Sequence, residues 1–295
     1  MGDDGRILAR TEVRTEASRG PGAVLDTLRQ TIIDLGATFD AVKGVGVACA
    51  GQIHPETGSV VEAPNLGWRD VPLAEELRRV LRVPVLVEND VRAAAWGEFA
   101  LGAGAGADSL IAVFVGTGLG SGAVLDGKLW RGAGNAAGEL GHTQVVPDGI
   151  PCPCGRRGCL ERYVSGSGFQ GRLRAALAEG RPTALKARTR GDTTVLTATL
   201  VEEAATEGDP VALEMWDDAV RYLTIALANY VTLVNPRVLV LGGGVIETVP
   251  ALFEAAASGV PELTTTLGRA VLRIERARLG DWSGVVGAAA LASAA

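Results

Sequence analysis

Residues 152–161 read Cys-Pro-Cys-Gly-Arg-Arg-Gly-Cys-Leu-Glu and hold three of the chain's four cysteines. His142, one of only two histidines, lies ten residues before the first of them, in the segment Gly-Glu-Leu-Gly-His at residues 138–142. Three thiolates and one imidazole fit a closed tetrahedral Zn²⁺ site, and the glycines let the loop wrap around the ion. We therefore expect a structural zinc ion, and not a catalytic one, held by His142, Cys152, Cys154 and Cys159.

A disulfide and free thiols are the alternatives for the three clustered cysteines. Cys152 and Cys154 are two residues apart, a spacing that suits shared metal ligation better than an unstrained disulfide. The first residues show no signal-peptide pattern, so we expect a reducing, cytoplasmic location. Both observations favour the metal site.

A glycine-rich turn precedes the cysteines. Residues 110–115 form an apolar run typical of a strand, and Gly-Thr-Gly-Leu-Gly-Ser-Gly follows at residues 116–122. Glycines let backbone N–H groups converge without Cβ obstruction, which makes a nest for phosphate oxygens. The alternative is a tight hairpin, because residues 123–125 and 128–130 are typical of strands around Asp126-Gly127. The turn alone does not decide between these interpretations, and both can hold at once.

Further candidate residues lie at other expected turns. Asp90 follows a predicted strand and precedes an alanine-rich helix, so it is either a general base or a helix N-cap, and taken alone the cap is favoured. Asn65 offers a donor and an acceptor for a sugar hydroxyl, although an asparagine in a loop more often stabilises the turn. Gly242-Gly243-Gly244 is either a strand-to-helix turn or a flat floor for a purine ring.

Composition excludes several classes of protein. The 295 residues suffice for one or two domains, and 28 basic against 34 acidic residues make the chain mildly acidic. We expect no nucleic acid partner, because no basic patch with interleaved aromatic residues is found. No apolar run is long enough for a membrane span.

Periodicity predicts an α/β chain. The helix at residues 210–233 is long and strongly apolar on one side, which suits a core or an interface helix. Helices are predicted at residues 21–37, 73–81, 91–98, 167–177, 196–206, 210–233, 249–257 and 285–294. Strands are predicted at residues 6–13, 42–48, 59–61, 83–87, 110–115, 123–125, 128–130, 237–241 and 271–277, with a polar connection at residues 180–192.

The order of these segments resembles the ROK family of bacterial sugar kinases and related repressors, and within it the glucokinases. The marks are Glu88-Asn89-Asp90 with the alanine-rich helix behind it, the glycine turn at residues 116–120, the Gly-Glu-x-Gly-His and cysteine segments, and the triple glycine. The resemblance implies a two-domain, actin-like and hexokinase-like (ribonuclease H-like) α/β fold with an interdomain cleft. The implied domains are residues 1–107 with 282–295, and residues 108–281 with the zinc loop.

The resemblance also implies the role of each candidate residue. Asp90 would accept the proton of the sugar's 6-hydroxyl, and a zinc ion on His142 would fix the sugar-binding side chains in place. The other hydroxyls would be held by Asn65, Asn89, Glu139, His142 and Glu161. ATP, bound with Mg²⁺, would contact Gly116, Thr117 and Gly118 with its phosphates and Gly243 and Gly244 with its adenosine.

Two segments depart from the family pattern. Kinases of the family open with a strand carrying Asp-x-Gly-Gly-Thr, which brings an acid to Mg²⁺, and this sequence has no such segment. We expect two strands and a turn, roughly fifteen to twenty residues, to be missing, which would leave unpaired sheet edges. Residues 50–53 read Ala-Gly-Gln-Ile where the family has a proline-glycine-proline turn.

The leading hypothesis is ATP-dependent phosphorylation of a hexose at its 6-hydroxyl, with glucose as the first candidate. Mannose, N-acetylmannosamine and fructose stay open as substrates. The alternatives are the core of a sugar-sensing transcriptional regulator and an inactive, zinc-stabilised sugar-binding protein. The family leads us to expect a homo-oligomer, either a dimer or a tetramer.

Overall fold

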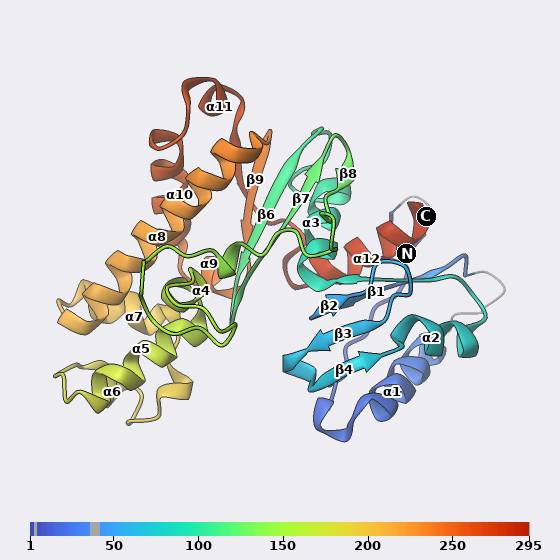
Figure 1. Cartoon of the computed structure of the whole chain (residues 1–295), viewed down its shortest axis with the longest axis horizontal. Coiled ribbons are helices and arrows are strands. Elements are labelled where there is room, and N and C mark those ends of the chain that lie inside the picture. The colour runs from blue at the N-terminus through green and yellow to red at the C-terminus, as the bar shows by residue number, and fades with distance from the viewer. Residues whose placement is uncertain (3–4, 36–41, 295) are drawn as a thin grey trace. The chain divides into compact units, whose positions relative to one another are not determined.

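The chain divides into two units, and it passes between them within strand β7 (Leu119–Leu125). The computed structural model describes residues 1–2, 5–35 and 42–294 (Figure 1). Unit 1 comprises Met1–Asp108, Gly122–Gly138 and Arg278–Ala295, and unit 2 comprises Ser109–Ser121 and Glu139–Ala277. Residues 122–138 therefore belong with unit 1 by their contacts, whereas the expected domain boundaries assign them to the second domain. Those boundaries stay a prediction.

Unit 1 contains two small sheets. Strand β1 (Val45–Cys49) pairs in parallel with β5 (Val85–Asn89), and β3 (Val60–Ala63) pairs in antiparallel fashion with β2 (Gln52–Ile53) and β4 (Trp68–Val71). Within the described ranges, β5 is the only strand paired with β1.

Two helices bury apolar residues against these strands. Helix α2 (Leu73–Leu81) buries Leu73, Leu77 and Leu81 at helical spacing, with charged residues between them. Helix α1 (Pro21–Asp34) buries only Val24 fully, and its other apolar side chains pack partly buried against the same core.

Helix α12 (Ser283–Ala294) packs tightly against α3 (Asp90–Leu101) in unit 1. A Cβ atom on Gly97 would lie 2.6 Å from the backbone oxygen of Ser283, and one on Gly287 would overlap the backbone oxygen of Ala93. Only glycine permits helices to approach this closely. The last residues of the described chain thus complete the unit that begins at its N-terminus.

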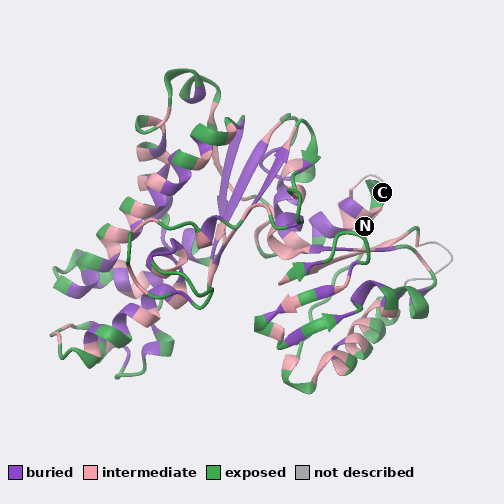
Figure 2. Ribbon diagram, viewed as in Figure 1, coloured by how far each residue is buried: buried purple, intermediate pink, exposed green. Residues whose placement is uncertain are grey.

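Unit 2 is built on buried parallel strands. Strands β6 (Leu110–Val115), β9 (Val238–Gly242) and β10 (Arg273–Arg276) are parallel. The sheet order is β10-β9-β6-β7-β8, in which β8 (Lys128–Leu129) and residues 122–125 of β7 belong to unit 1. Figure 2 shows β6 and β9 buried along their length. Continuous apolar runs are typical of parallel strands that are covered on both faces.

The helices of unit 2 vary widely in length. The longest, α8 (Pro210–Val234), starts at an Asp209 N-cap and buries one side. The others are α4 (Glu161–Val164), α5 (Gly166–Ala178), α6 (Leu185–Arg188), α7 (Ala198–Thr206), α9 (Gly244–Thr248), α10 (Pro250–Glu262) and α11 (Thr266–Val271). No described helix is both long enough and apolar enough to cross a membrane.

The prediction of a strand at residues 6–13 is wrong. These residues form no strand, and among the described residues before α1 the only helix is the short 3₁₀ helix η1 (Ala17–Arg19). Alternating side chains make a strand only where a neighbouring strand accepts its hydrogen bonds, and no described strand pairs with this segment. Helix α1 ends at Asp34, before the predicted end at Ala37, which lies outside the described residues.

Candidate functional site

Asp90 is the first residue of α3, directly after β5, but it is not the N-cap. Asn89 fills that position, because its Oδ1 accepts the N–H groups of Val91 (3.1 Å) and Arg92 (3.0 Å). The Asn89 Nδ2 donates to Asp90 Oδ1 (3.0 Å) and to the backbone oxygen of Gly51 (3.2 Å). The cap interpretation of Asp90 is therefore wrong, and its carboxylate is oriented by Asn89.

Burial raises the pKa of the Asp90 carboxyl above its ordinary value. The N–H of Val91, the Asn89 side chain and the charge of Arg92 oppose this rise without cancelling it. A carboxylate with a raised pKa holds a proton more readily than a solvated one.

A buried ion pair supports the same turn. Glu88 and Arg92 are each 3% exposed, and Glu88 Oε1 accepts from Arg92 Nη2 at 2.7 Å and from Arg92 Nε at 2.9 Å. Arg131 Nε donates to Glu88 Oε2 at 2.7 Å, and Arg92 Nη1 donates to the backbone oxygen of Asn135 at 2.9 Å. The sequence analysis missed this pair, because Glu88 ends a strand and Arg92 begins a helix, so helical spacing does not link them.

Asn65 lies in the 3₁₀ helix η3 (Pro64–Leu66) of unit 1 and is exposed. Its side chain has no hydrogen bond to any described residue, so it does not stabilise the turn in that way. It lines a pocket of about 440 Å³ together with Gly67 and the residues that begin α1.

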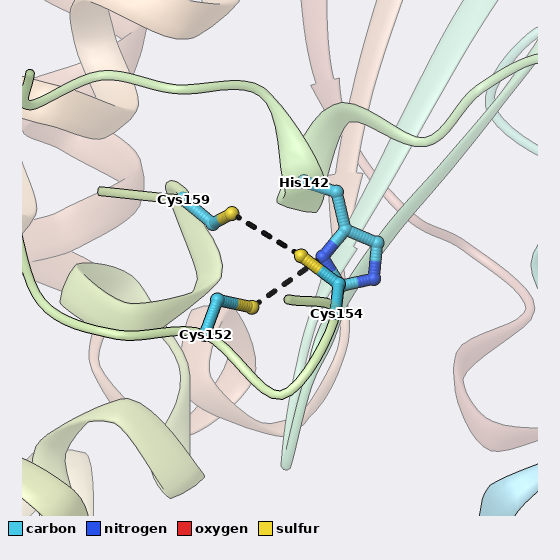
Figure 3. Close-up of side chains that lie close together, drawn as sticks. All are labelled: His142, Cys152, Cys154 and Cys159. Carbon is cyan, nitrogen blue, oxygen red and sulfur yellow. Dashed lines mark hydrogen bonds between the residues drawn. The ribbon is translucent and has the colours of Figure 1, made fainter. Parts of the chain in front are cut away.

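In unit 2, the four expected zinc ligands converge (Figure 3). Cys152 Sγ lies 3.8 Å from His142 Nδ1, Cys154 Sγ lies 3.6 Å from Cys159 Sγ, and all four ligand atoms lie within 4.8 Å of one another. Ligands around a tetrahedral Zn²⁺ ion are separated by about 3.5–3.8 Å, given Zn–S and Zn–N bonds of about 2.3 and 2.0 Å. The four residues therefore fit such an ion.

The thiols of this cluster differ in acidity. A hydrogen bond from the backbone N–H of Arg156 lowers the pKa of Cys154 to about 6. Burial raises the pKa of Cys159 to about 12 and also raises that of Cys152. A bound cation stabilises thiolates, so the two buried thiols gain most from a metal partner.

The loop backbone requires glycine at two positions. Gly155 and Gly158 have positive φ values of 87° and 72°, and a Cβ atom on Gly158 would overlap the backbone oxygen of Val146. Glycine adopts these dihedral angles without steric cost, so the loop can pass this close to Val146; that the loop wraps a zinc ion stays a prediction.

The same loop brings His142 and Glu161 near each other. The N–H of Leu160 donates to the backbone oxygen of Thr143 (2.9 Å), so the residues next to this bond, His142 and Glu161, lie on adjacent segments. Glu161 Oε2 accepts the N–H of Leu119 at 2.9 Å, which ties the carboxylate to the glycine turn. Glu139 is exposed and begins the 3₁₀ turn that contains His142.

A pocket of about 250 Å³ lies entirely within unit 2. Gly116 and Thr117 of the glycine turn and Gly244 of α9 line it, whereas Gly118 faces Glu161 and Gly243 packs on Val115. The remaining lining residues, which the sequence analysis missed, are Gly166, Ser167, Gln170, Leu196, Thr197, Ala198, Val245 and Thr248.

Backbone hydrogen bonds hold the wall of this pocket. The N–H groups of Gly166 and Ser167 donate to the backbone oxygens of Gly116 (2.9 Å) and Thr117 (3.0 Å), so the start of α5 is fixed to the glycine turn. Thr117 is exposed, and its hydroxyl has no hydrogen-bond partner in the described part of the chain. The turn therefore offers a hydroxyl donor to an incoming ligand.

Comparisons with known proteins agree on one family. The ROK family model matches residues 1–295. The chain is 33% identical to a glucokinase of Streptomyces coelicolor over 293 residues, covering 98% of this chain and 92% of the glucokinase. A xylose repressor of Caldicellulosiruptor bescii is 31% identical over 219 residues, covering 74% of this chain and 54% of the repressor.

A solved structure gives the same result for the fold. The ROK family glucokinase from Streptomyces griseus, in complex with glucose and AMPPNP, superimposes with a TM-score of 0.79 at 33% identity. The match covers 100% of this chain and 94% of that one. It confirms the expected hexokinase-like, actin-like α/β fold.

Proposed function

Because the chain belongs to the ROK family, we propose that it is a sugar kinase that transfers the terminal phosphoryl group of ATP to the 6-hydroxyl of a hexose. Glucose is the first substrate to test, since the similar glucokinase from Streptomyces griseus holds glucose and AMPPNP. The observation that carries the proposal is Asp90, a half-buried carboxylate of raised pKa at the carboxyl end of β5, held in one orientation by Asn89.

Phosphoryl transfer depends on positioning and charge neutralisation more than on a strong base, because its transition state is loose. Asp90 would orient the 6-hydroxyl through a hydrogen bond and accept its proton late in the transfer. Its raised pKa favours that acceptance. Mg²⁺ would arrive with ATP and neutralise phosphate charge.

The remaining hydroxyls of the sugar would be held by Asn65, Asn89, Glu139, His142 and Glu161. In this scheme the His142 imidazole ligates zinc through Nδ1, which faces Cys152, and its Nε2–H stays available to a sugar hydroxyl. The zinc ion would serve as a rigid cross-link of the loop. Asn89 already uses both its donors and its acceptor inside unit 1, so it would contact the sugar through a shared hydrogen bond.

The pocket in unit 2 supports a nucleotide site. Gly116 and Thr117 would approach the phosphates together with Gly118, and Gly243 and Gly244 would lie beside the adenosine. Gly243 has a φ of 88°, and a Cβ atom there would lie 2.6 Å from the backbone oxygen of Val115. Gly243 thus permits α9 to start close to the end of β6.

The test compares Asp90→Asn with the wild type in a coupled phosphorylation assay across glucose, mannose, N-acetylmannosamine and fructose. We expect a loss of turnover of roughly 100-fold or more, within the range that acid–base catalysis supplies, and nearly unchanged glucose affinity by calorimetry. The control is Asp26→Asn, an exposed acid on α1, which should retain full turnover. Unchanged turnover in Asp90→Asn would remove Asp90 as the base.

A second candidate function is the sugar-sensing core of a transcriptional regulator, favoured by the match to the xylose repressor. This candidate, and an inactive sugar-binding protein, both predict that the wild-type chain binds a hexose and phosphorylates none of the four sugars. The same two assays therefore separate the kinase from both alternatives.

A further inference from the structure

Gln170 lines the unit 2 pocket with a side-chain amide whose orientation is fixed. It lies in the first turns of α5, and its Nε2 donates to the backbone oxygens of Thr194 (2.8 Å) and Leu196 (3.3 Å). Thr194 belongs to the 3₁₀ helix η5 (Thr193–Val195). Only the NH₂ end of an amide can face two carbonyl oxygens, so these contacts determine which end of Gln170 is nitrogen.

Gln170 therefore presents Oε1, which can only accept a hydrogen bond. Both amide hydrogens are used, and Gln170 Oε1 has no hydrogen-bond partner among the residues that the structure describes. The other polar side chains that line the pocket, on Thr117, Ser167, Thr197 and Thr248, are hydroxyls that rotate to donate or to accept. No charged side chain lines the pocket in the described residues. Gln170 is therefore the lining side chain best able to distinguish a donor from an acceptor on a ligand.

The position of Gln170 suits contact with a nucleobase. Gly166 and Ser167 are hydrogen-bonded to the glycine turn, where the phosphates would lie. Gln170 follows Gly166 by four residues and Ser167 by three, so it lies on the same face of α5, about 5–6 Å further along the helix. A nucleotide with its phosphates at Thr117 would extend toward Gln170 with its base.

We propose that Gln170 selects nucleotides whose base carries an exocyclic amino group, such as adenine, over those with a carbonyl at the same position, such as hypoxanthine. This inference rests on the proposed nucleotide site. The adenine amino group would donate to Oε1, whereas the hypoxanthine carbonyl would face Oε1 with two acceptors in contact. Rotating the Gln170 amide would turn Oε1 toward the carbonyl oxygens of Thr194 and Leu196. Two hydrogen bonds would then be lost, and the affinity for the ligand would fall.

The test measures the affinities of ADP and inosine diphosphate for the full chain by calorimetry. We expect the wild type to bind ADP roughly 10- to 100-fold more tightly, the effect of one lost hydrogen bond with an unpaired acceptor left behind. Gln170→Met, which has a similar length and no acceptor oxygen, should reduce this ratio to about 3-fold or less. The matched control is Thr206→Val, which alters an exposed hydroxyl that lies outside the pocket lining and is bonded to the backbone oxygen of Glu202, and it should preserve the ratio.

The affinity ratio separates selection from a purely structural role, because loosening the loop at residues 193–196 would weaken both diphosphates equally. Equal binding of the two diphosphates by the wild type would overturn the inference and leave the nucleotide site standing. An unchanged ratio in Gln170→Met would also overturn it. Absence of binding by either diphosphate at millimolar concentration would refute the proposed site together with the inference.

Discussion

Replacing Glu98 with glutamine should strongly destabilise unit 1, although the change removes no atom from the side chain's outline. Glu98 is fully buried in α3. Its Oε1 accepts the N–H groups of Arg278 (3.0 Å) and Leu279 (2.8 Å), and its Oε2 accepts those of Ala103 (2.9 Å) and Arg278 (3.1 Å). The carboxylate thus binds three backbone donors, and two of them lie 180 and 181 residues after Glu98 in sequence.

A glutamine cannot accept all three of these N–H groups. If its NH₂ replaces Oε2, the N–H of Ala103 loses its acceptor, and if it replaces Oε1, the N–H of Leu279 does. The NH₂ group itself then faces N–H donors. An unpaired buried polar group costs about 1–3 kcal/mol, so two such groups should lower the free energy of unfolding by about 2–6 kcal/mol.

The measurement is urea denaturation followed by tryptophan fluorescence. Four of the five tryptophans, Trp68, Trp96, Trp130 and Trp282, belong to unit 1, so the signal reports mainly on that unit. The matched control is Glu62→Gln, which weakens an exposed ion pair with Arg69 and should cost less than about 1 kcal/mol. A loss below about 1 kcal/mol for Glu98→Gln would refute this account of the buried carboxylate.

Two further predictions concern the candidate site. Burial raises the pKa of Asp90 above its ordinary 3.8, so folding favours the protonated carboxyl. Protonation of Asp90 therefore stabilises the folded state fully below pH 3.8, and this contribution is lost as the pH rises through the folded-state pKa. Asp90→Asn, which cannot ionise, should therefore unfold at higher urea concentration than the wild type at pH 7, with a difference that shrinks toward pH 4; a variant less stable at pH 7 would contradict this. Cys154→Ser should lose bound zinc and sugar affinity together, as measured by elemental analysis and calorimetry, whereas Cys49→Ala, outside the cluster, should retain its zinc. If elemental analysis finds no zinc in the purified wild-type protein, the prediction is wrong.

The sequence predicts the fold best where local pattern and tertiary environment agree. Strand β6 and helix α2 match their predicted ranges at both ends, because a doubly covered parallel strand is a continuous apolar run and a half-buried helix repeats every 3.6 residues. Strands β2 and β4 have two and four residues, too few for a period to show. The predicted strand at residues 6–13 fails because alternation does not specify a pairing partner.

Prediction of the candidate site from sequence is limited in the same way, because local patterns do not show which distant segments meet. The positions of the four expected zinc ligands follow from spacing alone, and the structure brings them together. Gln170, Leu196 and Thr248 meet only because α5, η5 and α9 converge on the glycine turn, and no local motif encodes that meeting. Asn89 is the N-cap instead of Asp90, because the helix begins one residue earlier than predicted.

Unit 1 is built from three separate segments of the chain, including the last one, and this has a consequence for biosynthesis. The segments of unit 2 leave the ribosome before residues 278–294 do, so α3 is synthesised long before Arg278, Leu279 and α12, which saturate Glu98 and cover the helix. Until then, the helix that begins with Asp90 carries an unsatisfied carboxylate and an exposed glycine face. A nascent chain released before residue 278 would therefore present this face of α3 to chaperones and proteases.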